Sequence, residues 1–178
     1  MIDSELAELA RLLRGRNTID VRIGQLINRP MTSGHAGEWI ASRIFDIQLE
    51  PSAVARAIDG RFRTGPLAGR SVNVKWYLKR ENILDMTEST VVDYYLVLTG
   101  PKASAKDAKT LRPWCIDSVY LFDAQKVSAH QRVRGVKSGI AASIPEAQWR
   151  AAEIYPNPTC ESLPLTIEQR RWVALFAN

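Results

Sequence analysis

The fold of this chain is decided by residues 57–77, which read AIDGRFRTGPLAGRSVNVKWY. Two strand-like runs, 57–63 and 71–77, flank a turn-like segment, TGPLAG, at 64–69. Alternation of polar and apolar side chains is typical of a half-buried strand, and the stretch therefore predicts an antiparallel β-hairpin. In the second run the two faces are Val72, Val74 and Trp76, and Asn73, Lys75 and Tyr77.

The register of this hairpin decides which polar side chains meet. A hairpin symmetric about Leu67 sets Asp59 directly opposite Lys75, and Arg61 directly opposite Asn73. Directly opposed side chains have Cβ atoms roughly 4.5–5.5 Å apart, so a carboxylate, an amide and an ammonium would share one face. The alternative is an exposed hairpin with an ordinary cross-strand Asp–Lys pair, because sheets with one polar face are common.

The rest of the chain supplies helices on both sides of the hairpin and further strands after it. Helices are expected ahead of it at about 4–14, 19–28 and 35–46, with Gly15 ending the first. Apolar runs predict buried strands at 91–100 and 114–122 and a more exposed strand at 127–137. A loop is expected at 102–109, and two C-terminal helices at 144–154 and 166–176.

This order of elements indicates an α/β or α+β fold. We expect a central mixed sheet of about four to five strands, flanked by helices. The length suits a single domain, 1–178. Within it, an N-terminal helical segment (1–30) precedes an α/β core (31–140), and two helices close the chain (141–178).

The positive charge of the chain is concentrated in its first part. Residues 1–80 carry 13 Lys and Arg against 8 Asp and Glu, whereas residues 81–178 carry 11 of each. A basic region suits a polyanion, and phosphate contacts supply most non-specific affinity for nucleic acid. The charge by itself favours a nucleic-acid partner only slightly, because many proteins of high isoelectric point bind no nucleic acid, and a homodimer is left open.

Cysteine usage and hydropathy favour the cytoplasm. Cys115 and Cys160 lie far apart, which indicates buried thiols in a reducing compartment. With only His35 and His130 beside them, a structural zinc site is not expected. No apolar run approaches the roughly 20 residues of a membrane span, and the acidic first residues do not resemble a secretory signal.

The polar residues of the hairpin and of the helix before it form a candidate metal site. Hydrolysis of a phosphodiester requires a divalent cation, hard oxygen ligands that hold it, and a cationic group near the attacking water. The candidate ligands are Asp59, Glu38 and the backbone carbonyl of Val74, with Asn73 as a further one. Lys75 is the candidate cationic group, and Mg²⁺ or Mn²⁺ is the expected metal. Candidate phosphate contacts around this site are Arg61, Arg63 and Arg70.

This arrangement resembles the PD-(D/E)xK nucleases, which include type II restriction enzymes, Holliday-junction resolvases and repair nucleases. The resemblance rests on a helix with Glu38, a strand with Asp59, and a strand carrying Val72-Asn73-Val74-Lys75. The wider pattern over roughly residues 30–100 looks like an uncharacterised bacterial branch of that superfamily. It implies a restriction-endonuclease-like fold and a metal-dependent endonuclease, with Asp59, Glu38 and Lys75 as catalytic residues.

One position departs from the pattern of these nucleases. They usually carry Asp or Glu two residues before the lysine, where this chain has Asn73. An amide oxygen can ligate a hard cation but carries no charge, so we expect weaker metal binding. Either Glu38 supplies the missing carboxylate, or Glu81 or Asp85 folds back, or the site is degenerate.

Three functions remain open at this stage. The first is a metal-dependent DNA endonuclease. The second is a nucleic-acid-binding module on the same fold, which binds without cleaving. The third is a protein-interaction domain in which the Asp59–Lys75 pair is only a cross-strand salt bridge.

Overall fold

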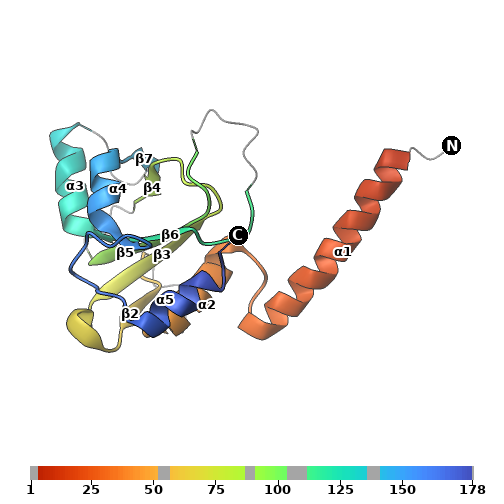
Figure 1. Cartoon of the computed structure of the whole chain (residues 1–178), viewed down its shortest axis with the longest axis horizontal. Coiled ribbons are helices and arrows are strands. Elements are labelled where there is room, and N and C mark those ends of the chain that lie inside the picture. The colour runs from red at the N-terminus through yellow and green to blue at the C-terminus, as the bar shows by residue number, and fades with distance from the viewer. Residues whose placement is uncertain (1–3, 52–56, 87–90, 104–111, 136–140, 178) are drawn as a thin grey trace.

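The computed structural model of the chain describes residues 4–51, 57–86, 91–103, 112–135 and 141–177. A six-stranded mixed sheet lies at its centre, in the order β1-β2-β3-β5-β6-β8 (Figure 1). β3 and β5 are parallel, and the other neighbours are antiparallel. The strands are β1 (Ile47–Leu49), β2 (Gly60–Phe62), β3 (Ser71–Tyr77), β5 (Tyr94–Thr99), β6 (Ser118–Asp123) and β8 (Glu153–Tyr155). A second, small sheet pairs β4 (Ile83–Asp85) with β7 (Ala141–Ser143).

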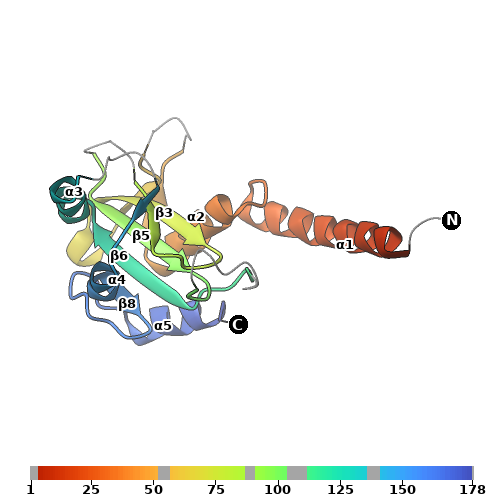
Figure 2. The ribbon, with the colours of Figure 1, turned by 90° about the horizontal axis from the view of Figure 1, so that it is seen from above.

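Helices cover both faces of the central sheet. α2 (Ser33–Ile44) and α5 (Ile167–Ala174) lie on one face, and α3 (Ala124–Val133) and α4 (Glu146–Ala152) lie on the other (Figure 1). α1 (Ser4–Ile27) extends away from this body, as Figure 2 shows most clearly. No helix in the described part of the chain is both long enough and apolar enough to cross a membrane.

The central strands are buried on both faces, as their apolar runs predict. Leu96, Leu98 and Leu121 pack with α2 and α5, whereas Val97 and Tyr120 pack with α3 and α4. Successive side chains of a strand point to opposite faces, so each apolar strand contributes side chains to the hydrophobic cores on both faces of the sheet. The expected α/β class and the mixed sheet are confirmed, with six strands rather than four or five.

Two expectations about helices are wrong. The first two predicted helices form one continuous helix, because Gly15 does not adopt the left-handed conformation that ends a helix. The hydroxyl of Thr18 donates to the carbonyl of Arg14 at 3.1 Å instead of capping a new helix. Over its described part, the strand expected at 127–137 is instead the helix α3. Asp123 caps this helix, and Val127 and Gln131, which lie one turn apart, are both buried.

Candidate functional site

The hairpin register differs from the predicted one by two residues. Arg61 pairs with Ser71 and Gly60 pairs with Val72, so Asp59 does not lie directly opposite Lys75. The turn contains a short 3₁₀ helix, Gly65–Leu67, and is closed by a hydrogen bond of 2.8 Å from Gly69 N–H to the carbonyl of Phe62. These two features move the centre of the hairpin from Leu67 to Pro66. Because the difference is an even number of residues, each side chain keeps its predicted face.

Asp59 lies where β2 and β3 begin to separate. Its N–H donates to Val72 O and its carbonyl accepts from Glu50 N–H, both at 2.9 Å, so its backbone is fixed between β1 and β3. Two residues further along β3, Val74 N–H donates to Asp59 Oδ2 at 2.7 Å. The Asp59 side chain therefore takes the place of a backbone partner. The carbonyl of Val74 points to the same side of β3 as its N–H.

The carboxyl group of Asp59 is shifted towards its neutral form. Burial raises the pKa of Asp59 to about 6, and the negative charge of Glu38 adds to the increase. The hydrogen bond from Val74 N–H and the positive charges of Lys75 and Arg29 lower the pKa of Asp59 and only partly offset the burial. A buried carboxylate of this kind is a group that a bound cation would stabilise in its charged form.

We expect this shift to appear in the stability of the metal-free protein. Because the folded pKa of Asp59, about 6, lies above its ordinary value, protonated Asp59 stabilises the fold below about pH 4 and this contribution is lost as pH rises through 6. The Asp59→Asn variant has no titrating group at this position, so it does not lose this stability as the pH rises. The difference in the free energy of unfolding between variant and wild type should grow by up to about 3 kcal/mol from pH 4 to pH 7. Urea unfolding in chelator measures it, and a difference independent of pH would contradict the shift.

Asn73 carries the least satisfied polar group of the site. Its side chain is only 5 % exposed, and Nδ2 donates to the carbonyl of Ala57 at 3.0 Å. The other amide atom, Oδ1, is buried and has no hydrogen-bond partner among the described residues. A buried acceptor without a partner costs about 1–3 kcal/mol, and a hard cation is one group that would satisfy it.

Lys75 shares the Asn73 face of β3 and lies two residues further along the strand. It is half-buried, and no salt bridge in the described ranges of the chain includes it. Its charge nevertheless acts on Asp59, whose pKa it lowers. The ammonium group therefore acts on the carboxyl group of Asp59 through its charge, and no direct ion pair joins the two in the described part of the chain.

Glu38 approaches from helix α2, which packs closely on β3. A Cβ atom at Gly37 would lie 2.9 Å from the Cβ atom of Trp76, so only glycine lets the helix come this near. Thr32 caps the helix by accepting a hydrogen bond from His35 N–H at 3.1 Å. Glu38 is mostly buried and binds Arg29 Nη1 at 2.5 Å. The sequence pattern gave no sign of this pairing, because Arg29 lies in the turn between α1 and α2.

Glu81 and Asp85, which one of the three alternatives folds back to Asn73, are engaged elsewhere. Glu81 binds Lys79 at 2.9 Å and Arg112 at 3.0 Å, and Asp85 accepts from the hydroxyl of Tyr77 at 3.3 Å. Within the described ranges, no group of three or more His, Cys, Asp or Glu side chains is placed to hold a metal ion. The candidate ligands are therefore a carboxylate, an amide oxygen and a backbone carbonyl, with Glu38 nearby.

The three arginines predicted as phosphate contacts lie at the turn end of the hairpin, away from Val74. Arg63 is bound to Asp46, which also accepts from Thr64, and these hydrogen bonds hold the pKa of Asp46 below its usual value. Arg70 binds Asp93 at 3.1 Å, and Arg61 donates to the carbonyl of Gly69 at 3.1 Å. All three are exposed, so they form a basic rim at the turn rather than the immediate surroundings of Asp59.

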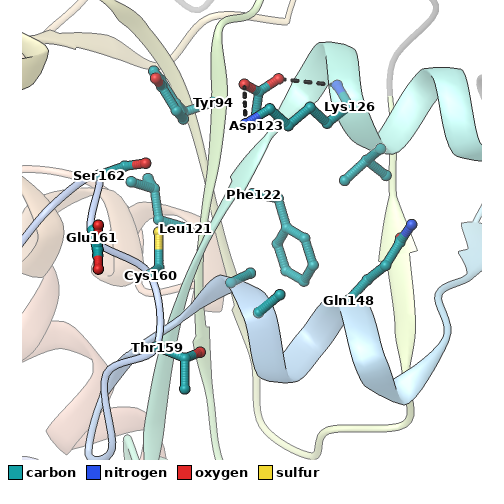
Figure 3. Close-up of a pocket in the computed structure, with 13 residues that line it drawn as sticks. Tyr94, Leu121, Phe122, Asp123, Lys126, Gln148, Thr159, Cys160, Glu161 and Ser162 are labelled. Atoms are coloured by element: carbon teal, nitrogen blue, oxygen red, sulfur yellow. Dashed lines mark hydrogen bonds and ion pairs between the residues drawn. The ribbon is translucent and has the colours of Figure 1, made fainter.

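A separate cavity of about 430 Å³ lies between β6, α3, α4 and the segment that follows β8. Figure 3 shows Asp123 and Lys126 at one side of it and Cys160 and Glu161 at another. None of the predicted site residues lines this cavity. Comparison of the chain with models of known protein families and with curated proteins finds no match in either.

Proposed function

We propose that this protein is a metal-dependent endonuclease that hydrolyses phosphodiester bonds in DNA, of the PD-(D/E)xK type and with a restriction-endonuclease-like fold. One observation carries the proposal. The buried Asn73 Oδ1 has no partner in the described part of the chain, and it lies next to Val74, whose N–H binds the carboxylate of Asp59. A hard cation would satisfy this orphaned acceptor and would also stabilise the charged form of the buried Asp59.

The donor set suits a hard divalent ion, and Mg²⁺ or Mn²⁺ is the proposed cofactor. Asp59, Asn73 Oδ1 and the carbonyl of Val74 would hold it, and all three supply oxygen ligands. When bound, such an ion polarises a phosphoryl oxygen and lowers the pKa of water. Glu38 would stay paired with Arg29 and act on the site through its charge, which raises the pKa of Asp59.

Lys75 has the role of the cationic group beside the reacting phosphate. Its ammonium group lies on the Asn73 face of β3, and its charge acts on Asp59. It would orient the attacking water and balance the negative charge that develops in the transition state. The exposed Arg61, Arg63 and Arg70 would contact the DNA backbone further along the hairpin, where their contribution is sequence-independent.

A nucleic-acid-binding module without catalysis is the second candidate. The observation that favours it is the replacement of a carboxylate by Asn73 together with the ion pair between Glu38 and Arg29. Both reduce the negative charge available to a cation. This module would bind DNA with a strong salt dependence, with a slope of about −0.9 per neutralised phosphate, and would cleave nothing.

The Asn73→Asp variant distinguishes the two candidates. A carboxylate at this position adds a charged ligand, so the nuclease should need a lower Mn²⁺ concentration for half-maximal cleavage, by about tenfold. The measurement is a Mn²⁺ titration of nicking on duplex, branched and single-stranded DNA. Asn82→Asp, at a half-buried asparagine outside the proposed site, is the control and should leave the titration unchanged.

If both wild type and Asn73→Asp bind DNA but cleave no DNA or RNA substrate with Mn²⁺, the binding module replaces the nuclease. If neither binds DNA at low salt, both candidates fail and the protein-interaction domain is left.

A further inference from the structure

The long N-terminal helix exposes most of its apolar side chains. Ile27 is its only buried residue, and Figure 2 shows the remainder of α1 projecting away from the body. A 24-residue helix is about 36 Å long, and most helical stability in proteins comes from packing an apolar face. The exposed large apolar residues of α1 are Leu6, Leu9, Leu12, Leu13, Ile19, Val21 and Leu26.

One face of α1 has a seven-residue repeat. Leu12, Ile19 and Leu26 recur at this spacing, and each is more than half exposed. A second row, one turn away on the same face, is Glu8, Gly15 and Arg22. Residues seven apart lie nearly above one another on a helix, so the two rows form one continuous stripe. One row of the stripe is therefore apolar, as in a coiled-coil seam, and the other consists of Glu8, Gly15 and Arg22.

The stripe opens onto a groove whose lining includes Arg11, Arg16 and Asp20 beside its apolar residues. A cavity of about 600 Å³ lies between α1 and the body, where Met31 and Trp114 face Leu12 and Ile19. Trp114 stacks edge-on against Trp76, with ring centroids 5.5 Å apart, and remains 39 % exposed. One wall of the groove is therefore formed by Trp114, which packs on the core residue Trp76, and the other wall is formed by the exposed stripe of α1.

We propose that α1 pairs antiparallel with the α1 helix of a second copy of this chain, crossing at Gly15. The charges along the stripe are symmetric about that residue, because Glu8 lies seven residues before Gly15 and Arg22 lies seven after it. In the antiparallel pair, each Glu8 meets the other copy's position 22. In a parallel pair, like charges would meet at both positions, which disfavours that arrangement.

Gly15 itself supports a crossing of two helices at this point. Glycine in the middle of a helix costs about 1 kcal/mol relative to alanine, yet a Cβ atom here would meet nothing within 4 Å. The glycine therefore serves no contact within the described part of the chain. In the pair it lets two backbones approach, while Leu12 of one copy packs near position 19 of the other.

The surface offered by α1 is smaller than a standard interface. Standard interfaces bury about 800 Å² and involve about 20–30 residues on each side. Half of α1 supplies 12 residues, and Met31 and Trp114 add two, so we expect a dimer that dissociates on dilution. Two identical grooves are covered at once, because the pair has twofold symmetry.

The full-length protein tests this by sedimentation equilibrium over a dilution series. We expect a dimer, and Ile19→Glu should weaken it by about tenfold or more, since a charge would be buried in the seam. Val21→Glu is the matched control, because Val21 is exposed to the same extent, 59 % against 58 %, on the opposite side of the helix. Circular dichroism confirms that both variants fold. A monomeric wild type, or a dimer that resists Ile19→Glu, overturns the proposal.

A charge exchange tests the antiparallel register. Glu8→Arg and Arg22→Glu should each weaken the dimer, because each sets like charges against one another. When the two variants are mixed, both cross-pairs become attractive, and heterodimers should form about as tightly as the wild-type dimer. Failure of the mixture to recover association would overturn the antiparallel crossing at Gly15.

Discussion

The Lys75→Met variant is expected to lose cleavage by about 10³-fold while it binds DNA nearly as well as the wild type. Methionine keeps most of the length and apolar stem of lysine, so the packing of β3 is preserved. The lost ammonium group acts on charge that develops in the transition state, and such a loss lowers kcat without a large change in binding. Single-turnover cleavage with Mn²⁺, together with a DNA-binding isotherm in Ca²⁺, separates the two effects.

Lys126→Met is the matched control for this experiment. Lys126 lies on α3 beside the cavity of Figure 3 and is highly exposed, so its replacement removes one positive charge without touching the site. Cleavage by this variant should equal that of the wild type. Equal losses in both lysine variants would show that net charge, rather than the position of Lys75, governs activity.

The Asp59→Asn variant is expected to lose both metal binding and cleavage. An amide can still accept the hydrogen bond from Val74 N–H, so the junction of β2 and β3 should keep its shape. The charge that attracts the cation is gone, and two neutral oxygens and a carbonyl hold Mg²⁺ poorly. We expect metal affinity to fall by at least about tenfold, measured by Mn²⁺ titration calorimetry without DNA.

Asp85→Asn serves as the control for this carboxylate. Asp85 accepts from the hydroxyl of Tyr77, and its replacement should leave Mn²⁺ binding unchanged. If Asp85→Asn abolished binding and Asp59→Asn did not, the metal would lie beyond the end of β3 and the proposed ligands would be wrong.

Local patterns predict much of this fold. Alternating side chains identify β2 and β3, because a strand buried on one face alternates polar and apolar residues. Apolar runs identify β5 and β6, because a strand buried on both faces is apolar throughout. The same alternation places Asn73 and Lys75 on one face. The predicted strand at 127–137 fails because a short amphipathic segment fits both periods, and the cap at Asp123 decides for the helix.

The details of the site depend on contacts that have no local signal. The register of the hairpin depends on the 3₁₀ helix and on positive φ angles at Gly65 and Gly69, which move the pairing by two residues. The ion pair between Arg29 and Glu38 depends on how α1 and α2 meet. The raised pKa of Asp59 comes mainly from burial, which only the packed structure reveals.

We propose that Asp59, just before β2, and the middle of β3 hold a divalent cation. A crystal of the full-length protein soaked in Mn²⁺ tests it most directly, through anomalous scattering. We expect a peak in contact with the carboxylate of Asp59 and with Asn73 Oδ1, at the roughly 2.0–2.6 Å that hard-cation ligands adopt. A fully soaked crystal with no peak at these two residues, or with its peak elsewhere, would contradict it.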